Sequence, residues 1–203
     1  MRAAVAAVGV LGGAFNPPHV GHLVLAQEAA SQLGLDEVLL VPVGESPYKR
    51  IDPEPGREVR LDMARLAAEG NGALMASDLE TARDGPSFTC RTLEELSERR
   101  PGDDLFFLMG ADVAGGLEAW REPERVLELA RLGIAARPGS ALGDAEDVLE
   151  RLGARGRAEF LEMPEIGVSS SAVRRRVAEG RPIRYLVPDP VAELIDEREL
   201  YRA

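Results

Sequence analysis

Apolar and polar positions along this chain alternate between short apolar runs and longer stretches with helical spacing. The first apolar run covers residues 5–11, and after residue 22 apolar side chains recur every three or four positions up to Leu33. Gly34 follows, where a helix commonly ends in a left-handed residue, and residues 37–42 form a second, β-branched run. A strand, a helix and a strand at this spacing predict a βαβ unit with parallel strands and a right-handed crossover.

The same alternation continues along the rest of the sequence. It predicts further strands at residues 73–79, 105–109, 133–136 and 159–163, and further helices at about 57–69, 91–99, 123–130, 169–179 and 188–199. Residues 44–56, rich in proline and charge, are expected to form a long surface loop of a kind that binds ligands. Residues 140–157 are expected to form a variable helix-loop connection, to which the sequence assigns no function. The pattern predicts a single α/β domain over residues 1–203, with a Rossmann-like parallel sheet and helices on both faces.

Composition excludes several classes of function. The formal net charge of -11 argues against nucleic-acid and anionic-membrane partners, and the sequence contains no apolar run long enough to predict a membrane span. The single cysteine, Cys90, cannot form an internal disulfide, and no cysteine-histidine cluster predicts a zinc site. We therefore expect a cytoplasmic protein whose ligands are small anions. Whether it forms a homo-oligomer is left open by the sequence.

The segment at residues 12–22 carries the strongest functional signal. Glycines at residues 12–13 let the backbone turn sharply and approach a ligand, and prolines at residues 17–18 delay the helix until His19. The chain has only 2 histidines, His19 and His22, and this spacing predicts both in the first turn of the helix. Backbone N–H groups and the helix dipole attract an anion there, so the segment favours a polyphosphate site over a purely structural joint.

Two further groups of residues are candidates for binding chemistry. Ser170, Ser171 and Arg174 stand at the predicted start of the helix at 169–179, where serine hydroxyls and free N–H groups can bind phosphate. Taken alone, a serine-capped helix with exposed arginines is common. Gly110 and Asp112 follow a predicted strand, at the carboxyl end where open parallel sheets bind ligands.

These motifs resemble those of a known superfamily. Residues 12–22 resemble the Gly-x-Phe-x-Pro-x-His-x-Gly-His signature of the nucleotidyltransferases, and residues 169–174 resemble the serine-arginine motif that closes their nucleotide site. Shorter segments resemble the bacterial nicotinate-nucleotide adenylyltransferases, namely residues 85–89 with 92–93, 110–112 with Trp120, 137–139 and 183–188. The resemblance implies a nucleotidyltransferase fold and a step of NAD biosynthesis, in which ATP and nicotinate mononucleotide give deamido-NAD and pyrophosphate.

The resemblance also implies roles for individual residues, with His19, His22 and Arg174 as the catalytic set. The residues it implies for ATP are Gly12, Gly13, Ala14, Phe15, His19, His22, Lys49, Gly110, Asp112, Ser170, Ser171 and Arg174. Those it implies for nicotinate mononucleotide are Asn16, Gly44, Phe88, Thr89, Asp112, Trp120 and Arg137. In these sets Arg174 meets the β- and γ-phosphates, Thr89 the nicotinate carboxylate, Trp120 the pyridine ring and Arg137 the mononucleotide phosphate. Magnesium is expected to be carried by the ATP phosphates, with no tightly bound cofactor and no metal site of protein residues.

Three positions depart from the usual family pattern. Ala14, Asn16 and Tyr48 stand where relatives commonly have Thr, Asp and His, while Lys49 keeps its place as a charge for the triphosphate or as a surface residue. These departures leave open a non-catalytic nucleotide-binding regulator. An adenylyltransferase for nicotinamide mononucleotide or phosphopantetheine is a further alternative. The retained histidines favour an enzyme, and the matches at residues 120 and 137 favour nicotinate.

Overall fold

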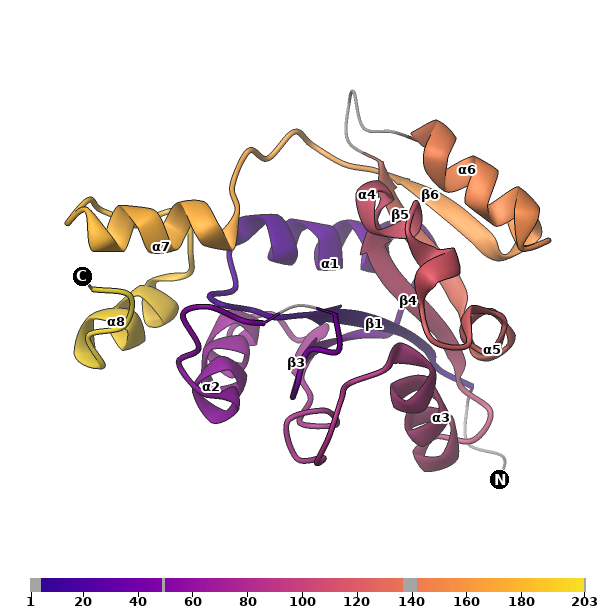
Figure 1. Ribbon diagram of the computed structural model, residues 1–203, viewed down its shortest axis with the longest axis horizontal. Helices are drawn as coiled ribbons and strands as arrows, with labels where there is room; N and C mark the ends of the chain where they lie inside the picture. Colours follow the sequence, from indigo (N-terminus) through magenta and orange to yellow (C-terminus); the bar gives the residue numbers. More distant parts are fainter. Residues whose placement is uncertain (1–4, 49, 137–141, 203) are drawn as a thin grey trace. The chain divides into compact units, whose positions relative to one another are not determined.

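Strands and helices alternate along the chain in this computed structural model, which describes residues 5–48, 50–136 and 142–202 (Figure 1). The strands are β1 (Ala7–Gly13), β2 (Glu37–Pro42), β3 (Leu74–Ala76), β4 (Asp104–Gly110), β5 (Arg131–Ala136) and β6 (Ala158–Glu162). The α-helices are α1 (Val20–Leu33), α2 (Arg57–Ala68), α3 (Thr89–Arg99), α4 (Ala111–Ala114), α5 (Pro123–Leu129), α6 (Leu142–Arg151), α7 (Ser170–Ala178) and α8 (Asp189–Glu197). Short 3-10 helices cover Leu117–Ala119 (η1) and Arg155–Arg157 (η2).

The described strands form one sheet in the order β3-β2-β1-β4-β5-β6. β4 pairs in parallel with β1 and with β5, and β5 pairs in parallel with β6. Val8 and Val10 of β1 are completely buried, because a parallel strand is covered on both faces. Figure 1 shows α1 on one face of β1 and β4, with α3 and α5 on the other. The predicted Rossmann-like α/β fold is therefore confirmed.

Some element boundaries differ from the predictions. β3 has three residues instead of seven, and the chain turns after Asp78, whose carbonyl accepts from Ala82 N–H at 2.8 Å. α3 begins at Thr89, two residues earlier than the pattern predicts. The sequence does not predict α4 or η1, since an element of one turn is too short to show a hydrophobic period.

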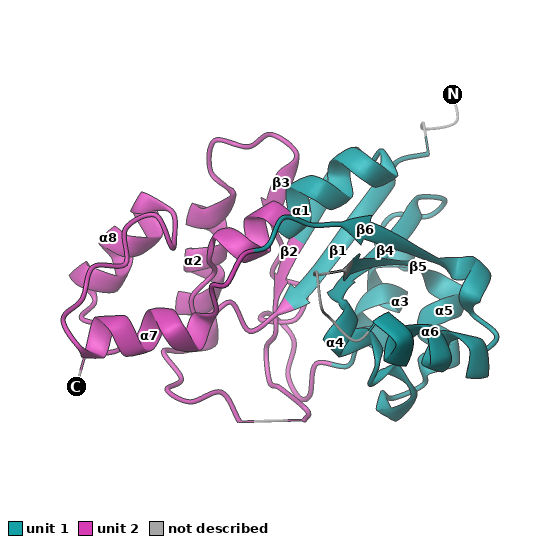
Figure 2. Ribbon diagram, turned by 90° about the horizontal axis from the view of Figure 1, so that it is seen from above, with its two compact units in different colours: residues 1–12, 25–39, 88–165 teal, residues 13–24, 40–87, 166–203 magenta. Residues whose placement is uncertain are grey.

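The chain divides into two compact units, each assembled from separate segments (Figure 2). Unit 1 consists of residues 1–12, 25–39 and 88–165. Unit 2 consists of residues 13–24, 40–87 and 166–203. The single domain expected from the sequence stays a prediction. Among the described residues, no helix is long and apolar enough to cross a membrane.

In unit 1, helices pack closely on the central strands. α3 contacts α5, and α4 contacts α6. Gly133 of β5 leaves room for the side chains packed over it, since a Cβ at this position would lie 2.6 Å from the side chain of Leu108 in β4 and 3.1 Å from that of Leu33 in α1. A larger residue at this position would therefore force these leucine side chains to shift.

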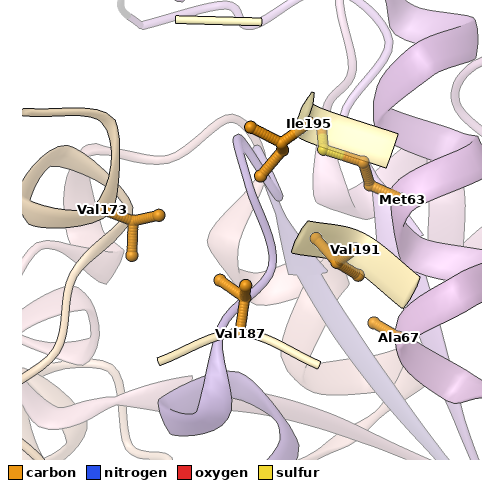
Figure 3. Packing of buried hydrophobic residues seen from close by; sticks show 6 residues of the cluster. All are labelled: Met63, Ala67, Val173, Val187, Val191 and Ile195. Atoms are coloured by element: carbon orange, nitrogen blue, oxygen red, sulfur yellow. The ribbon is translucent and has the colours of Figure 1, made fainter. Parts of the chain in front are cut away.

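In unit 2, a hydrophobic cluster holds three helices together. Figure 3 shows its buried side chains, which come from α2, α7, α8 and the segment before α8, namely Met63, Ala67, Val173, Val187, Val191 and Ile195. Complete burial of a valine, isoleucine or methionine side chain contributes about 1.5–3 kcal/mol to the free energy of unfolding. The cluster therefore fixes the start of α7 and the turn after α8 relative to α2.

Candidate active site

The loop between β1 and α1 turns through a strained residue. Phe15 has a φ of 46°, in the left-handed region, although it carries a bulky side chain that is almost completely buried. Such a conformation costs about 1–2 kcal/mol, and it persists only where the surrounding structure enforces it. The centre of the Phe15 ring lies 5.0 Å from that of His22, so the side chain of the strained residue packs against one of the two histidines.

The two histidines form a reciprocal cap at the start of α1. The helix begins at Val20, so His19 stands just before its first turn, and the prediction that His19 lies within that turn is wrong by one residue. The His19 carbonyl accepts from His22 N–H at 2.9 Å, and His19 N–H donates to Nδ1 of His22 at 3.1 Å. In the usual capping box a Glu or Gln side chain fills this acceptor position.

This cap determines which nitrogen of His22 can donate to a ligand. Because Nδ1 accepts from His19 N–H, the proton of a neutral His22 ring sits on Nε2. The rings of His19 and His22 also stack, with centroids 3.8 Å apart. Half-buried His22 therefore has an N–H donor at the helix start, where the dipole already favours an anion.

The start of α7 is hydrogen-bonded to the same loop. Ser169 caps the helix, because its hydroxyl accepts from Ala172 N–H. The hydroxyl of Ser170 donates to the carbonyl of Pro17 at 2.8 Å, and Nη1 of Arg174 donates to the carbonyl of Asn16 at 2.7 Å. The structure thus brings the serine-arginine motif, predicted from the sequence, to the loop that carries the two histidines.

Asn16 connects this loop to other parts of unit 2. Its side chain is only 2% exposed, and its amide donates to the carbonyl of Pro53 at 2.7 Å. Its Oδ1 accepts from the hydroxyl of Tyr201, in the turn after α8. These side-chain bonds are internal to the protein, and the contact with the mononucleotide that the resemblance implies for Asn16 stays a prediction.

Arg60 in α2 is a buried cation beneath the loop. Its side chain is completely buried and donates to the carbonyls of Ala14, Val43 and Gly44 and to the carboxylate of Glu54. In a trans peptide the C=O and the following N–H point in opposite directions. With the Ala14 carbonyl facing Arg60, the N–H of Phe15 points away from it.

The long loop at residues 44–56 borders a cavity of about 740 Å³ in unit 2. Tyr48, Arg50 and Arg57 line this cavity. Gly44 lies at its edge, where only glycine fits, because a Cβ would approach the Glu80 carbonyl oxygen to 2.2 Å. The start of the loop at Gly44 is therefore packed closely against the backbone of Glu80.

Unit 1 carries most of the residues that the resemblance assigns to the mononucleotide. Trp120 follows η1 and packs edge-on against Phe107, with ring centroids 5.7 Å apart. The guanidinium of Arg121 lies 4.7 Å from the ring centre of Phe88, and Thr89 opens α3. Trp120 as a whole is half-buried, so part of its side chain remains accessible to a stacking partner.

Gly110 and Asp112 lie together at the carboxyl end of β4. A Cβ at Gly110 would approach a carboxylate oxygen of Asp112 to 2.5 Å, so the Asp112 side chain would have to shift to accept a larger residue there. Asp112 itself is exposed in the first turn of α4. Lys49 and Arg137 lie outside the described residues, and their roles stay predictions.

Sequence reasoning missed Arg60, Tyr201 and Arg121. Of these three, only Arg60 could have been identified from the sequence, because it lies on the same face of α2 as the buried residues Met63 and Ala64. A cation in the middle of an apolar face is rarely tolerated unless it is hydrogen-bonded. No local pattern marks the contacts of Tyr201 or Arg121.

The chain is similar to proteins of one named activity. The cytidylyltransferase-like family model matches residues 10–176. The "Probable nicotinate-nucleotide adenylyltransferase" of Rhodopirellula baltica is 40% identical, covering 96% of this chain and 93% of the relative. The protein of the same name from Roseiflexus sp. is 42% identical, covering 97% and 98%. The fold is similar to that of Plasmodium falciparum nicotinic acid mononucleotide adenylyltransferase complexed with NaAD, with a TM-score of 0.79, 17% identity and 97% of each chain covered.

Proposed function

The chain belongs to the cytidylyltransferase-like family and, within it, to the nicotinate-nucleotide adenylyltransferases, and we propose from this premise that it joins the adenylyl group of ATP to nicotinate mononucleotide. The products are deamido-NAD and pyrophosphate. The observation that carries the proposal is the pair of hydrogen bonds from Ser170 and Arg174 to the loop that bears the histidines. We also propose a cytoplasmic location, which the lone Cys90 supports.

The triphosphate of ATP is proposed to bind in unit 2. The starts of α1 and α7 both present backbone N–H groups, and Nε2 of His22 adds a donor at the first of them. Nη2 of Arg174 is held by longer bonds, 3.4 Å to the Asp52 carbonyl and 3.3 Å to the Ser171 hydroxyl. A phosphate oxygen can replace these weak partners while Nη1 keeps its bond to the Asn16 carbonyl.

The reaction needs no covalent enzyme intermediate. An oxygen of the mononucleotide's 5′-phosphate attacks the α-phosphorus of ATP, the bond from this phosphorus to the bridging oxygen breaks, and pyrophosphate leaves with the electron pair. The attacking oxygen is already anionic, so no side chain has to remove a proton. Catalysis then consists of positioning and of stabilising the charge that develops on the phosphates, which is the part assigned to His22 and Arg174.

Magnesium is proposed to arrive with ATP. Among the described residues, no three His, Cys, Asp or Glu side chains are grouped so that they could hold a metal ion. Magnesium suits such a site, because it commonly keeps water molecules and substrate phosphate oxygens as its ligands. Bound in this way, the ion neutralises charge on the phosphates.

Measuring the release of pyrophosphate tests the proposed function. Wild-type protein is mixed with ATP and, in separate reactions, with nicotinate mononucleotide, nicotinamide mononucleotide or phosphopantetheine. We expect the fastest release with nicotinate mononucleotide, together with a product of the mass of deamido-NAD. Faster release with another acceptor would contradict the substrate, and no release with any acceptor would favour a nucleotide-binding regulator.

A further inference from the structure

We propose that Tyr201 is a positioning residue for adenylyl transfer, acting through Asn16 on the loop that carries His19 and His22. The inference rests on the proposed function, because it deepens the description of the same site. Tyr201 lies in the turn after α8, and it has no counterpart among the residues that the family resemblance assigns. Its hydroxyl contacts Asn16, and we assign it a positioning role through this residue.

Asn16 is the point at which the loop is held. Oδ1 of Asn16 accepts from the Tyr201 hydroxyl at 2.5 Å, its amide donates to the Pro53 carbonyl, and its own carbonyl accepts from Arg174. One buried residue thus ties the turn after α8, the loop at 44–56 and α7 to the histidine loop. A shift of Asn16 would move its carbonyl, to which Arg174 donates a hydrogen bond. It would also move the backbone that leads from Asn16 to His19.

The structure places Tyr201 firmly enough to act in this way. Its side chain packs against the hydrophobic cluster of unit 2, and its hydroxyl lies 3.9 Å from the sulfur of Met63. Glu199 and Tyr201 both have positive φ, 50° and 61°, which is unfavourable for residues other than glycine. The strained turn places the tyrosine hydroxyl against the buried side chain of Asn16, and such strain persists only where the surrounding structure enforces it.

Burial keeps the hydroxyl of Tyr201 protonated, so it remains a hydrogen-bond donor. Burial raises the pKa of the phenol above its ordinary value of 10.0, while the nearby guanidinium groups of Arg174 and Arg60 act in the opposite direction and Glu54 adds to the increase. The effect of burial is the largest of these. The phenol therefore keeps its proton over the working range of an enzyme, and the bond to Asn16 persists there.

The same geometry explains why an amide suits position 16 in this chain. An asparagine can accept from Tyr201 with its oxygen and donate to the Pro53 carbonyl with its nitrogen. An aspartate at this position could accept from the tyrosine but would place an oxygen against the Pro53 carbonyl. The pairing of Asn16 with Tyr201 is thus a specific arrangement for holding the loop at 44–56.

The test is Tyr201→Phe, which removes the hydroxyl and keeps the packed ring. Tyr185→Phe is the matched control, because the same atom is removed from a side chain in unit 2 that is 80% exposed. We expect kcat to fall about tenfold or more in Tyr201→Phe, since misplacing reacting groups by about 1 Å can cost 10²-fold. The control is expected to keep wild-type kcat and KM.

A second comparison tests whether Tyr201 acts through Asn16. We expect the double variant Tyr201→Phe/Asn16→Ala to be no slower than Asn16→Ala alone, because the partner of the hydroxyl is already absent. Additive losses would overturn the proposal, as would a folded Tyr201→Phe protein with kcat within twofold of wild type.

Hydrogen exchange of the peptide covering residues 13–22 gives a readout that needs no turnover. We expect faster exchange in Tyr201→Phe than in Tyr185→Phe, and equal exchange would contradict the inference. A wild-type protein that releases no pyrophosphate contradicts the proposed function instead. An active wild type with an equally active Tyr201→Phe variant contradicts only the role of the tyrosine.

Discussion

The backbone N–H of His19 donates a hydrogen bond to Nδ1 of His22, three residues further along the chain. Through this bond, one histidine side chain both caps α1 and keeps its second nitrogen, Nε2, as a donor for an anion. Structural and catalytic contributions of His22 are thus carried by different atoms of one ring, and substitutions can separate them.

His22→Gln and His22→Ala are expected to differ in stability but not in activity. Glutamine can accept from His19 N–H as in a capping box, whereas alanine loses the cap at a cost of about 0.5–2 kcal/mol of unfolding free energy. Both lose the Nε2 donor, so we expect kcat to fall about 10²-fold or more in each. Urea unfolding and pyrophosphate release measure the two effects, with Gln27→Ala on the exposed face of α1 as control. Activity of His22→Ala within a few-fold of wild type would contradict the assignment.

Arg174→Ala is expected to raise the KM for ATP and to lower kcat. The substitution removes a charge from the triphosphate and releases the Asn16 carbonyl, to which Nη1 now donates. Lysine should restore activity only in part, because a single ammonium group cannot copy the two nitrogens that Arg174 uses. Arg175→Ala is the control, since its side chain is exposed on the same helix. If both alanine variants show the same kinetics, the charge at 174 has no special role.

Arg60→Met is expected to destabilise the protein much more than Arg65→Met on the same helix. Removing the buried guanidinium leaves the carbonyls of Ala14, Val43 and Gly44 without this donor, which should lower the free energy of unfolding by about 3 kcal/mol or more. Arg65 is largely exposed and pairs with Asp62, so its loss should cost about 1 kcal/mol or less. Urea unfolding of the two variants decides the matter, and similar midpoints would show that the buried network contributes little.

Tyr201 makes stability depend on pH in alkaline solution. Because burial raises the pKa of its phenol, the folded protein keeps a proton that the unfolded chain loses above about pH 10. The stabilising contribution is therefore complete below that pH and is lost as the pH rises toward the folded-state pKa. Between about pH 9.5 and 11 we expect the free energy of unfolding to fall more steeply in wild type than in Tyr201→Phe. Tyr185→Phe should keep the wild-type slope, and equal slopes in all three would contradict the effect of burial.

The sequence predicts the βα alternation and the histidine loop because both are encoded locally. Apolar runs define the buried strands, and glycine, proline and histidine within residues 12–22 specify a turn and a helix start. The contact between Tyr201 and Asn16 joins positions 185 residues apart, and no periodicity records it. Arg60 is hidden for a related reason, since an arginine in a helix is usually exposed and only its place among buried neighbours distinguishes it.

Unit 1 raises a question about how a carboxylate is recognised. The segments at residues 88–92 and 110–120 contain a single basic residue, Arg91, which is exposed on α3, and the structure adds Arg121 over the ring of Phe88. Arg121 is also paired with Glu122, which offsets its charge. We therefore expect the nicotinate carboxylate to be bound by Thr89 and backbone N–H groups, with Trp120 stacked on the pyridine ring.

This arrangement predicts the preference between the two pyridine mononucleotides. A site that satisfies a carboxylate with N–H donors faces the hydrogens of an amide when nicotinamide mononucleotide binds, and such mismatches cost several kcal/mol. We expect nicotinate mononucleotide to be preferred in kcat/KM by about 10²-fold or more, a preference that Arg121→Ala leaves intact. Trp120→Ala should weaken use of the mononucleotide much more than the KM for ATP. Competition of both mononucleotides in one reaction measures the preference. Equal use by wild type would refute the specificity, and a preference lost in Arg121→Ala would show that this guanidinium reads the carboxylate.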